Sequence, residues 1–175
     1  MNRPQESLKD DTYHFHQTPE PLAIDLLKNI PFKENDVVFE PFKGEGAFYN
    51  NFPKNTTNLF TEKEEGSDFR DYNDLTFDWV ISNPPFRLEE NGKRENAFFK
   101  ILDYFADKVN EGIAFLGNDY CLSTLTPSRM KKLNNKGIYI HNIVVCSVKK
   151  WRGRYFFIIF KKHKSDVFTY LEKTY

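Results

Sequence analysis

The chain has 175 residues, which suits one compact domain with a buried core and is too short for two domains with separate cores. Aromatic residues make up 17% of it and charged residues 29%, a mixture that excludes a wholly disordered chain. No apolar run approaches the roughly 18 residues needed to cross a membrane, and the N-terminus lacks the apolar segment of a secretory signal. We therefore expect one intracellular domain over residues 1–175, with residues 1–14 as a disordered leader.

The formal net charge of zero hides an uneven distribution of charge along the chain. Residues 1–125 contain 13 Lys or Arg against 23 Asp or Glu, whereas residues 126–175 contain 12 against 2. This basic block favours an anionic partner, because Lys and Arg gain affinity for phosphates by releasing counterions. The alternative is that the acidic surface of the same fold neutralises the block.

Helical and extended segments alternate along the chain. The first expected helix covers residues 20–29, with Thr18 as its N-cap and Pro19 at the first helical position. Strands are expected, in order, at 36–39, 57–61, 77–82, 112–116, 139–148 and 155–162. Further helices are expected at 47–51, at 95–109 with one apolar face, and at 126–135, but none between 61 and 78. The last two strands, joined by residues 149–154, predict a closing hairpin.

This order of elements predicts the fold class. It indicates an α/β domain with a Rossmann-like, mostly parallel sheet of about six to seven strands, helices on both faces and a C-terminal antiparallel hairpin. Cys121 and Cys146 lie in apolar segments without a His or Cys at metal-ligand spacing, so buried reduced thiols and no metal site are expected. Ligands of such a fold bind beyond the carboxyl ends of the strands.

Residues 40–48, here called the glycine loop, follow the first expected strand. They read Glu40-Pro41-Phe42-Lys43-Gly44-Glu45-Gly46-Ala47-Phe48. Two glycines one residue apart permit a tight turn and let a ligand approach the backbone closely. An ordinary glycine turn is the alternative interpretation.

Two further segments follow the second expected strand. Glu62 can accept two hydrogen bonds from ribose hydroxyls, although it lies in an acidic stretch with Glu64 and Glu65 and could be one more solvated side chain. Asp68 supplies an acceptor for an adenine amino group, and Phe69 supplies a ring to stack on or flank the base. With the glycine loop, these residues predict a nucleoside pocket.

The segment Asn83-Pro84-Pro85-Phe86 ends the third expected strand. Two consecutive prolines remove two backbone donors and fix two φ angles, which predicts a rigid loop. Such a loop would present the Asn83 amide oxygen and the Pro84 carbonyl to an amine, with Phe86 as an aromatic face. Two fixed acceptors localise the lone pair of an exocyclic amine so that it can attack a methyl group without a strong base. The alternative is a plain strand-ending turn.

Together these segments resemble the class I S-adenosylmethionine-dependent methyltransferases, and more narrowly their amino-methyltransferase branch, from about Thr18 to Lys162. The resemblance implies S-adenosylmethionine as cofactor, with Thr18 and Pro19 near its methionine carboxylate and Glu62 as its ribose ligand. It makes Asp68 and Phe69 the adenine contacts. The glycine-loop residues that it implies as cofactor ligands are Glu40, Pro41, Phe42, Gly44, Gly46 and Phe48.

The tetrapeptide at 83–86 matches the Asp/Asn/Ser-Pro-Pro-aromatic motif of enzymes that methylate adenine N6, cytosine N4 or glutamine nitrogen. Its Asn-Pro-Pro-Phe form favours adenine or glutamine. One departure from the family is that only five residues separate Glu62 from Asp68, where a helix and a strand are usual. We therefore expect a shortened sheet of about six strands and a loop that walls the adenine pocket, as in compact phage and plasmid forms.

The candidate substrate contacts lie in the expected hairpin turn, at Lys149, Lys150, Trp151 and Arg152. Cations interleaved with an aromatic ring suit phosphate contacts and base stacking, although an ordinary solvated turn is the alternative. The segment 86–96 is long for a connection and is the candidate substrate lid. No separate target-recognition domain is expected.

The expected function is methyl transfer to adenine N6 in DNA. RNA N6-adenine methylation, protein glutamine methylation and a catalytically silent methyltransferase-like subunit that binds nucleic acid are the alternatives. The expected partner is nucleic acid, DNA ahead of RNA. A homodimer or a specificity partner stays open.

Overall fold

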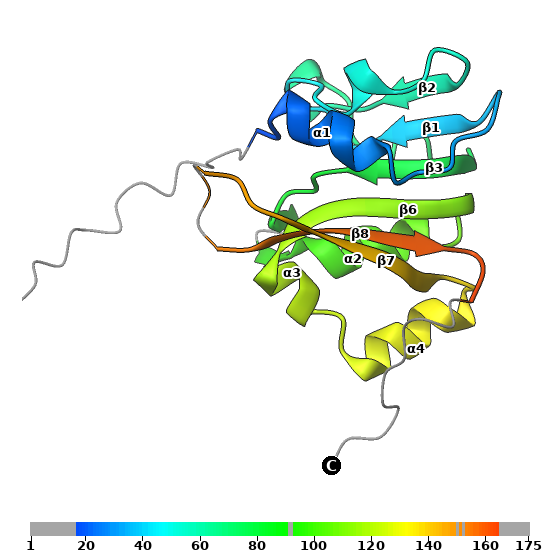
Figure 1. The fold of residues 1–175 in the computed structure, drawn as a ribbon. Helices are drawn as coiled ribbons and strands as arrows, with labels where there is room; N and C mark the ends of the chain where they lie inside the picture. The colour runs from blue at the N-terminus through cyan, green and yellow to red at the C-terminus, as the bar shows by residue number, and fades with distance from the viewer. Residues whose placement is uncertain (1–16, 91–92, 150, 152, 165–175) are drawn as a thin grey trace, which may run out of the picture.

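The centre of the molecule is a six-stranded sheet (Figure 1). The computed structural model describes residues 17–90, 93–149, 151 and 153–164. The strands of this sheet are β1 (Val37–Glu40), β2 (Thr57–Phe60), β3 (Phe77–Ser82), β6 (Val109–Asn118), β7 (Tyr139–Cys146) and β8 (Tyr155–Lys161). Across the sheet they lie in the order β2-β1-β3-β6-β8-β7. The expected shortened sheet and the expected fold class are confirmed.

Four neighbouring strands of the sheet are parallel. β1 pairs in parallel with β2 and β3, and β3 pairs in parallel with β6. β8 is antiparallel to both β6 and β7, which gives the expected C-terminal hairpin. The carboxyl ends of β1, β2, β3, β6 and β7 therefore all lie at one edge of the sheet, here called the functional edge.

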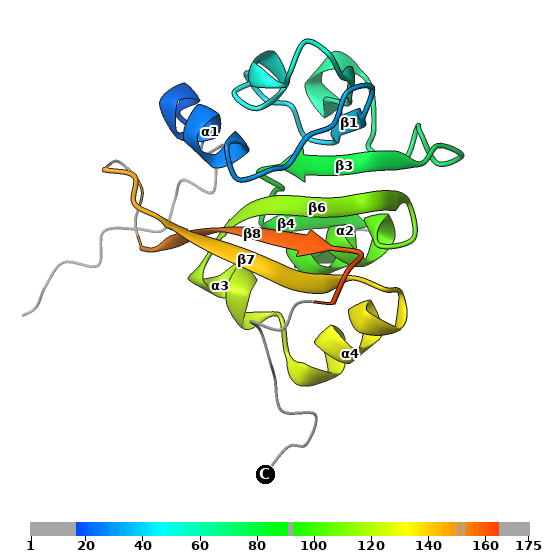
Figure 2. The same ribbon diagram turned by 45° about the vertical axis from the view of Figure 1, so that its right-hand side comes forward.

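Helices cover the two faces of the sheet. They are α1 (Glu20–Leu27), α2 (Ala97–Phe105), α3 (Asp119–Ser123) and α4 (Pro127–Asn135), with single 3-10 turns η1 (Tyr49–Asn51) and η2 (Lys63–Glu65). α1 lies near β1, whereas α4 lies beside β7 (Figure 2). The expected helix at 47–51 is thus only the single turn η1.

The core forms two clusters, one on each face, because successive strand residues point to opposite sides. Val38 and Ile81 pack with Leu26 of α1 on one face. Val80 packs on the other face with α2 and α4. The apolar side of α2 is buried as its spacing predicts, with Phe98 at 0% exposure. The segment before α2 contacts this core through half-buried Leu88.

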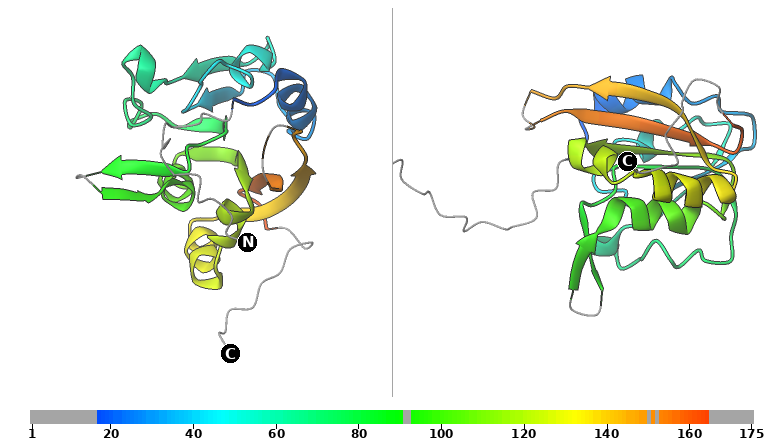
Figure 3. Two further views of the ribbon diagram at one scale, coloured as in Figure 1. Left: turned by 90° about the vertical axis from the view of Figure 1, so that its left-hand side faces the viewer. Right: turned by 90° about the horizontal axis from the view of Figure 1, so that it is seen from below.

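That segment is a two-stranded hairpin, β4 (Arg87–Glu90) and β5 (Lys93–Asn96), where the sequence analysis expected a loop at 86–96. It projects from the body of the domain (Figure 3). The missed signal is the Asn-Gly pair at 91–92, which is typical of two-residue hairpin turns. Half-buried Leu88 packs against the core on the α2 side and joins the hairpin to the domain.

Cys121 and Cys146 are buried free thiols, as expected. Within the described ranges, no group of three or more His, Cys, Asp or Glu side chains could hold a metal ion. None of the helices in the same ranges is long and apolar enough to span a membrane. Residues 61–76, all described, contain no strand and no α-helix.

We predict that Gly112→Ala destabilises the fold much more than Gly66→Ala. A Cβ at Gly112 would lie 2.2 Å from the Phe160 carbonyl oxygen and 2.8 Å from the Trp79 ring, so two packed strands must move apart. At Gly66 a Cβ meets nothing within 4 Å and only the positive φ of 84° opposes it. Urea unfolding should show a loss of about 3 kcal/mol or more at Gly112 and about 1 kcal/mol at Gly66. Equal losses would contradict the close approach at β6.

Candidate functional site

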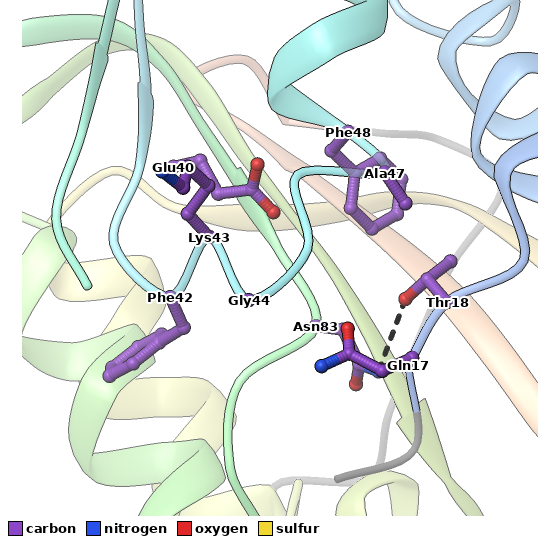
Figure 4. Close-up of a pocket in the computed structure, with 9 residues that line it drawn as sticks. All are labelled: Gln17, Thr18, Glu40, Phe42, Lys43, Gly44, Ala47, Phe48 and Asn83. Atoms are coloured by element: carbon purple, nitrogen blue, oxygen red, sulfur yellow. Dashed lines mark hydrogen bonds between the residues drawn. The ribbon is translucent and has the colours of Figure 1, made fainter. Parts of the chain in front are cut away.

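Three segments meet at the functional edge because β2, β1 and β3 are neighbours in the sheet. The glycine loop leaves β1, Glu62 follows β2, and Asn83 follows β3. Gln17 and Thr18 reach the same place from the segment before α1 (Figure 4). Topology, rather than proximity in sequence, assembles this site.

Two adjoining pockets lie between these segments. The first is open, with a volume of about 320 Å³, and its lining residues are Gln17, Thr18, Glu40, Phe42, Lys43, Gly44, Ala47, Phe48 and Asn83. The second has a volume of about 590 Å³, and its lining residues are Gln17, Gly44, Glu45, Glu62, Glu64 and Glu65. Gln17 and Gly44 line both pockets, so the two pockets adjoin at these residues.

The glycine loop adopts the backbone that its glycines permit. Gly44 and Gly46 have φ angles of 52° and 83°, which residues with a Cβ rarely adopt. A Cβ at Gly46 would also lie 2.8 Å from the side-chain Nδ2 of Asn50. Gly46 N–H donates to the Lys43 carbonyl (2.8 Å) and closes the turn.

Two buried carboxylates hold the glycine loop in place. The Gly44 N–H donates to Glu62 Oε2 (2.6 Å), and the Tyr49 N–H donates to Glu40 Oε2 (2.7 Å). Glu40 and Glu62 are 2% and 7% exposed. Hydrogen bonds from backbone N–H groups compensate part of the cost of burying these acids. The loop is therefore held at Gly44 in its middle and at Tyr49 just beyond its end, rather than being a free turn.

Burial is the main influence on Glu40. It raises the pKa of that carboxyl well above its ordinary value of 4.5, and the charge of Glu62 raises the pKa further. The hydrogen bond from Tyr49 and the charge of Lys43 oppose this rise. A cation bound in the adjoining pocket would favour the ionised form of Glu40.

Lys43 is a residue of the site that the sequence analysis did not single out. Its Nζ forms an ion pair with Glu65 and lies 3.8 Å from the centre of the Phe60 ring. These contacts tie the glycine loop to β2 and to the turn η2. A lysine beside two glycines was the available signal, but its partners are set only by the fold.

The Asn-Pro-Pro-Phe loop begins where β3 ends. Asn83 lines the first pocket, and its Nδ2 donates to Thr18 Oγ1 (3.3 Å). Pro84 is buried, Pro85 is half-buried, and half-buried Phe86 packs against both core clusters. The loop is thus wedged into the core, with Asn83 facing the ligand space.

Thr18 is not the N-cap of α1, which corrects one expectation. Pro19, with ψ of 131°, occupies the cap position, makes no side-chain cap bond, and lets the helix begin at Glu20. Because the extended backbone of Pro19 keeps Thr18 outside the helix, the Thr18 hydroxyl is available to Asn83. Pro19 itself does not line either of the two pockets.

Asp68 and Phe69 lie outside the lining of both pockets. Asp68 accepts hydrogen bonds from the backbone and side chain of Arg70. Phe69 is 4% exposed, and its ring lies 5.3 Å from both Phe42 and Tyr104. Their contact with an adenine stays a prediction, whereas the core role of Phe69 is visible.

The turn between β7 and β8 also lies at the functional edge, because β7 ends there and β8 begins there. Lys149 is exposed, and Trp151 is half-buried with its ring 4.5 Å from that of Tyr155. Lys150 and Arg152 lie outside the described residues. Lys149 and Trp151 therefore lie at the functional edge, and their role as substrate contacts stays a prediction.

Part of the basic block is neutralised within the fold. Lys132 of α4 and Lys136, which directly follows α4, form ion pairs with Asp103 of α2, and Lys136 also pairs with Asp107. Arg154 pairs with Asp119. The alternative interpretation of the block thus holds for these three cations.

We predict that Glu40→Gln removes a pH-dependent loss of stability. The pKa of Glu40 is higher in the folded than in the unfolded chain, so the stability it contributes is complete below about pH 4.5 and is lost as pH rises through the folded pKa. Gln keeps an oxygen acceptor for Tyr49 N–H but cannot ionise. The free energy of unfolding of the variant, minus that of the native chain, should therefore grow from about pH 4.5 upward. Urea unfolding across this range would contradict the assignment if the difference stayed constant.

Comparison with known proteins finds similarity in structure. No protein-family model matches the chain, and no curated protein matches it in sequence. A methyltransferase from Pyrococcus furiosus matches with 20% identity and a TM-score of 0.57, over 83% of each chain. A putative class I S-adenosylmethionine-dependent methyltransferase from Listeria monocytogenes matches with 14% identity and a TM-score of 0.56, over 84% of this chain and 60% of that one.

A third solved structure is the modification subunit of a putative type I restriction enzyme from Vibrio vulnificus YJ016. It matches with 13% identity and a TM-score of 0.61, over 83% of this chain and 44% of that one. The chain thus spans less than two thirds of the length of the Listeria and Vibrio proteins. At these identities the likeness is one of fold, and the chain has the Rossmann-like α/β fold of these methyltransferases.

Proposed function

We propose that this chain is an S-adenosylmethionine-dependent methyltransferase that methylates adenine N6 in DNA. The observation that carries the proposal is the placement of Asn83 in the same pocket as the glycine loop. An amide acceptor on a rigid proline loop is thereby set against a site suited to a nucleoside ligand. The shared methyltransferase fold supports the same conclusion.

The residues of the two pockets fit this cofactor. The glycines let the cofactor approach the loop backbone closely. Glu62 lines the second pocket, and its carboxylate can accept hydrogen bonds from ribose hydroxyls in addition to the one from Gly44. The buried carboxylate of Glu40 lies beside the first pocket, where a positive sulfonium would be stabilised. When bound, the cofactor supplies an electrophilic methyl group.

The chain's own part in the reaction is to hold the amine. Asn83 Oδ1 and the Pro84 carbonyl accept hydrogen bonds from its two N–H groups, which localises its lone pair and aims it at the methyl group. Nitrogen forms its bond to the methyl carbon as the carbon–sulfur bond breaks, and the proton then leaves the nitrogen for water. No strong base is required, so an amide that does not titrate is sufficient.

DNA is the proposed substrate because of the chemistry at the functional edge. A base must leave its stack to reach Asn83. Exposed Lys149 and the aromatic Trp151 lie in the turn at this same edge, where a backbone phosphate and an unstacked base could be bound. The Vibrio protein with this fold is a modification subunit of a putative restriction enzyme.

The experiment is transfer of a labelled methyl group from S-adenosylmethionine to adenine-containing DNA, to RNA and to a glutamine peptide. We expect N6-methyladenine in the DNA, identified by mass spectrometry of its nucleosides. Transfer only to RNA or only to the peptide would replace DNA as the substrate. No transfer to any of the three, together with no cofactor binding by calorimetry, would overturn the enzymatic proposal in favour of a silent binding subunit.

Asn83→Ala should abolish transfer and leave cofactor affinity nearly intact, because Asn83 acts on the amine. Loss of one such acceptor should lower kcat by about 100-fold or more, with the cofactor Kd within about twofold of the native value. Asn110→Ala is the matched control, since Asn110 lies near the start of β6, at the opposite end of the sheet, and bonds Asp78. A parallel loss of cofactor binding in Asn83→Ala would mean that the catalytic loop is misplaced.

Glu62→Ala should weaken cofactor binding, since it removes both the ribose acceptor and the partner of Gly44. Hydrogen bonds to a charged group predict a rise in Kd of about 10- to 100-fold, measured by calorimetry. Exposed Glu34, remote from both pockets, provides the control variant Glu34→Ala. An unchanged Kd in Glu62→Ala would exclude the carboxylate from the cofactor site.

A further inference from the structure

The hydrogen bond between Thr18 and Asn83 joins two segments that are 65 residues apart in sequence. The Asn83 Nδ2 group donates to Thr18 Oγ1 at 3.3 Å, as the dashed line in Figure 4 shows. Both side chains line the first pocket. Thr18 is held at this place by α1, whose Ala23 and Leu26 are buried in the core.

The direction of this bond matters because a carboxamide has two different ends. Its oxygen only accepts hydrogen bonds, and its NH₂ group only donates them. The prolines after Asn83 stiffen the backbone, but they do not fix rotation of the side-chain amide. A half-turn of that amide would place its NH₂ group against the N–H groups of an incoming amine, where donor would face donor.

We propose that Thr18 is a positioning residue that sets the orientation of the Asn83 carboxamide. Because a hydroxyl can accept or donate, Thr18 fixes this orientation when its own proton is donated to the cofactor in the same pocket. Its oxygen then accepts from Nδ2, and Oδ1 is turned toward the amine that receives the methyl group. This inference rests on the proposed function and gives Thr18 a role beyond contact with the cofactor. The same residue lines the cofactor pocket, so binding of the cofactor and orientation of the amide meet at one hydroxyl.

The test compares two substitutions at one position. Thr18→Val has nearly the same shape without an acceptor, and Thr18→Ser keeps the hydroxyl. At saturating cofactor and DNA, Thr18→Val should lower kcat about tenfold, the factor expected for loss of one hydrogen bond in the transition state. Because Thr18 also lines the cofactor pocket, the cofactor Kd of Thr18→Val should rise by about tenfold at most, which saturating cofactor overcomes. Thr18→Ser should restore kcat to within about threefold of the native value.

Thr124→Val is the matched control for loss of a threonine hydroxyl. Thr124 is 7% exposed, and its Oγ1 donates to the Cys121 carbonyl (2.7 Å), outside both pockets. Its kcat should equal that of the native chain. A raised cofactor Kd with an unchanged kcat in Thr18→Val would make Thr18 a cofactor contact only, and failure of serine to restore kcat would also overturn the proposal.

A second measurement needs no methyl transfer. The side-chain amide signals of Asn83 in a ¹⁵N-labelled protein are identified by their absence from Asn83→Ala. One of the two protons should be shifted downfield in the native chain and in Thr18→Ser, and should move upfield in Thr18→Val. Unchanged signals in Thr18→Val would overturn the orientation, whereas the expected shift in a chain without transfer activity would overturn only the proposed function.

Discussion

The site depends on one hydrogen bond between the ends of two strands, from the Gly44 N–H to the buried carboxylate of Glu62. A loop with two glycines at positive φ has many other conformations, and an outside constraint must select one. Glu62 provides it from β2, and Glu40 provides a second constraint through Tyr49. Burying two acids is costly, so the backbone donors and the carboxylates stabilise each other. The glycine loop therefore forms a fixed wall of both pockets.

The Asn-Pro-Pro-Phe loop takes its place from the same sheet order. β3 is the other neighbour of β1, so Asn83 faces the wall that Glu62 holds, and the Ser82 hydroxyl bonds the Phe42 carbonyl (3.4 Å) to join the two loops. The short connection from Glu62 to β3 leaves β2 as the outermost strand of the sheet. The turn η2, which Lys43 holds through its ion pair with Glu65, borders the second pocket. The shortened sheet thus keeps the parts that face the ligand.

The strands, the buried face of α2 and the end of β3 could be predicted from the sequence, because each depends on residues close together in the chain. Apolar runs locate the strands, helical spacing locates the buried face of α2, and two prolines after a strand fix the end of β3. Partners distant in sequence could not be predicted. Thr18 suggests a helix cap until the fold places its hydroxyl near Asn83, and an aromatic residue such as Phe69 fits a core as well as a ligand site. The hairpin after Phe86 is polar, and backbone pairing rather than an apolar pattern forms it.

The distribution of charge along the sequence also did not predict where the charged side chains lie in the fold. The basic block suggests one cationic surface, yet Lys132 and Lys136 are matched by Asp103 of α2 and by Asp107, outside the lining of both pockets. Exposed cations matter for a phosphate backbone only where the base can also reach Asn83. The β7–β8 turn lies at the functional edge with Asn83, and the β4–β5 hairpin begins directly after the Asn-Pro-Pro-Phe loop. Under the proposed function, these two hairpins would contribute contacts to the substrate beside a rigid loop, and selectivity would depend in part on the shape between them.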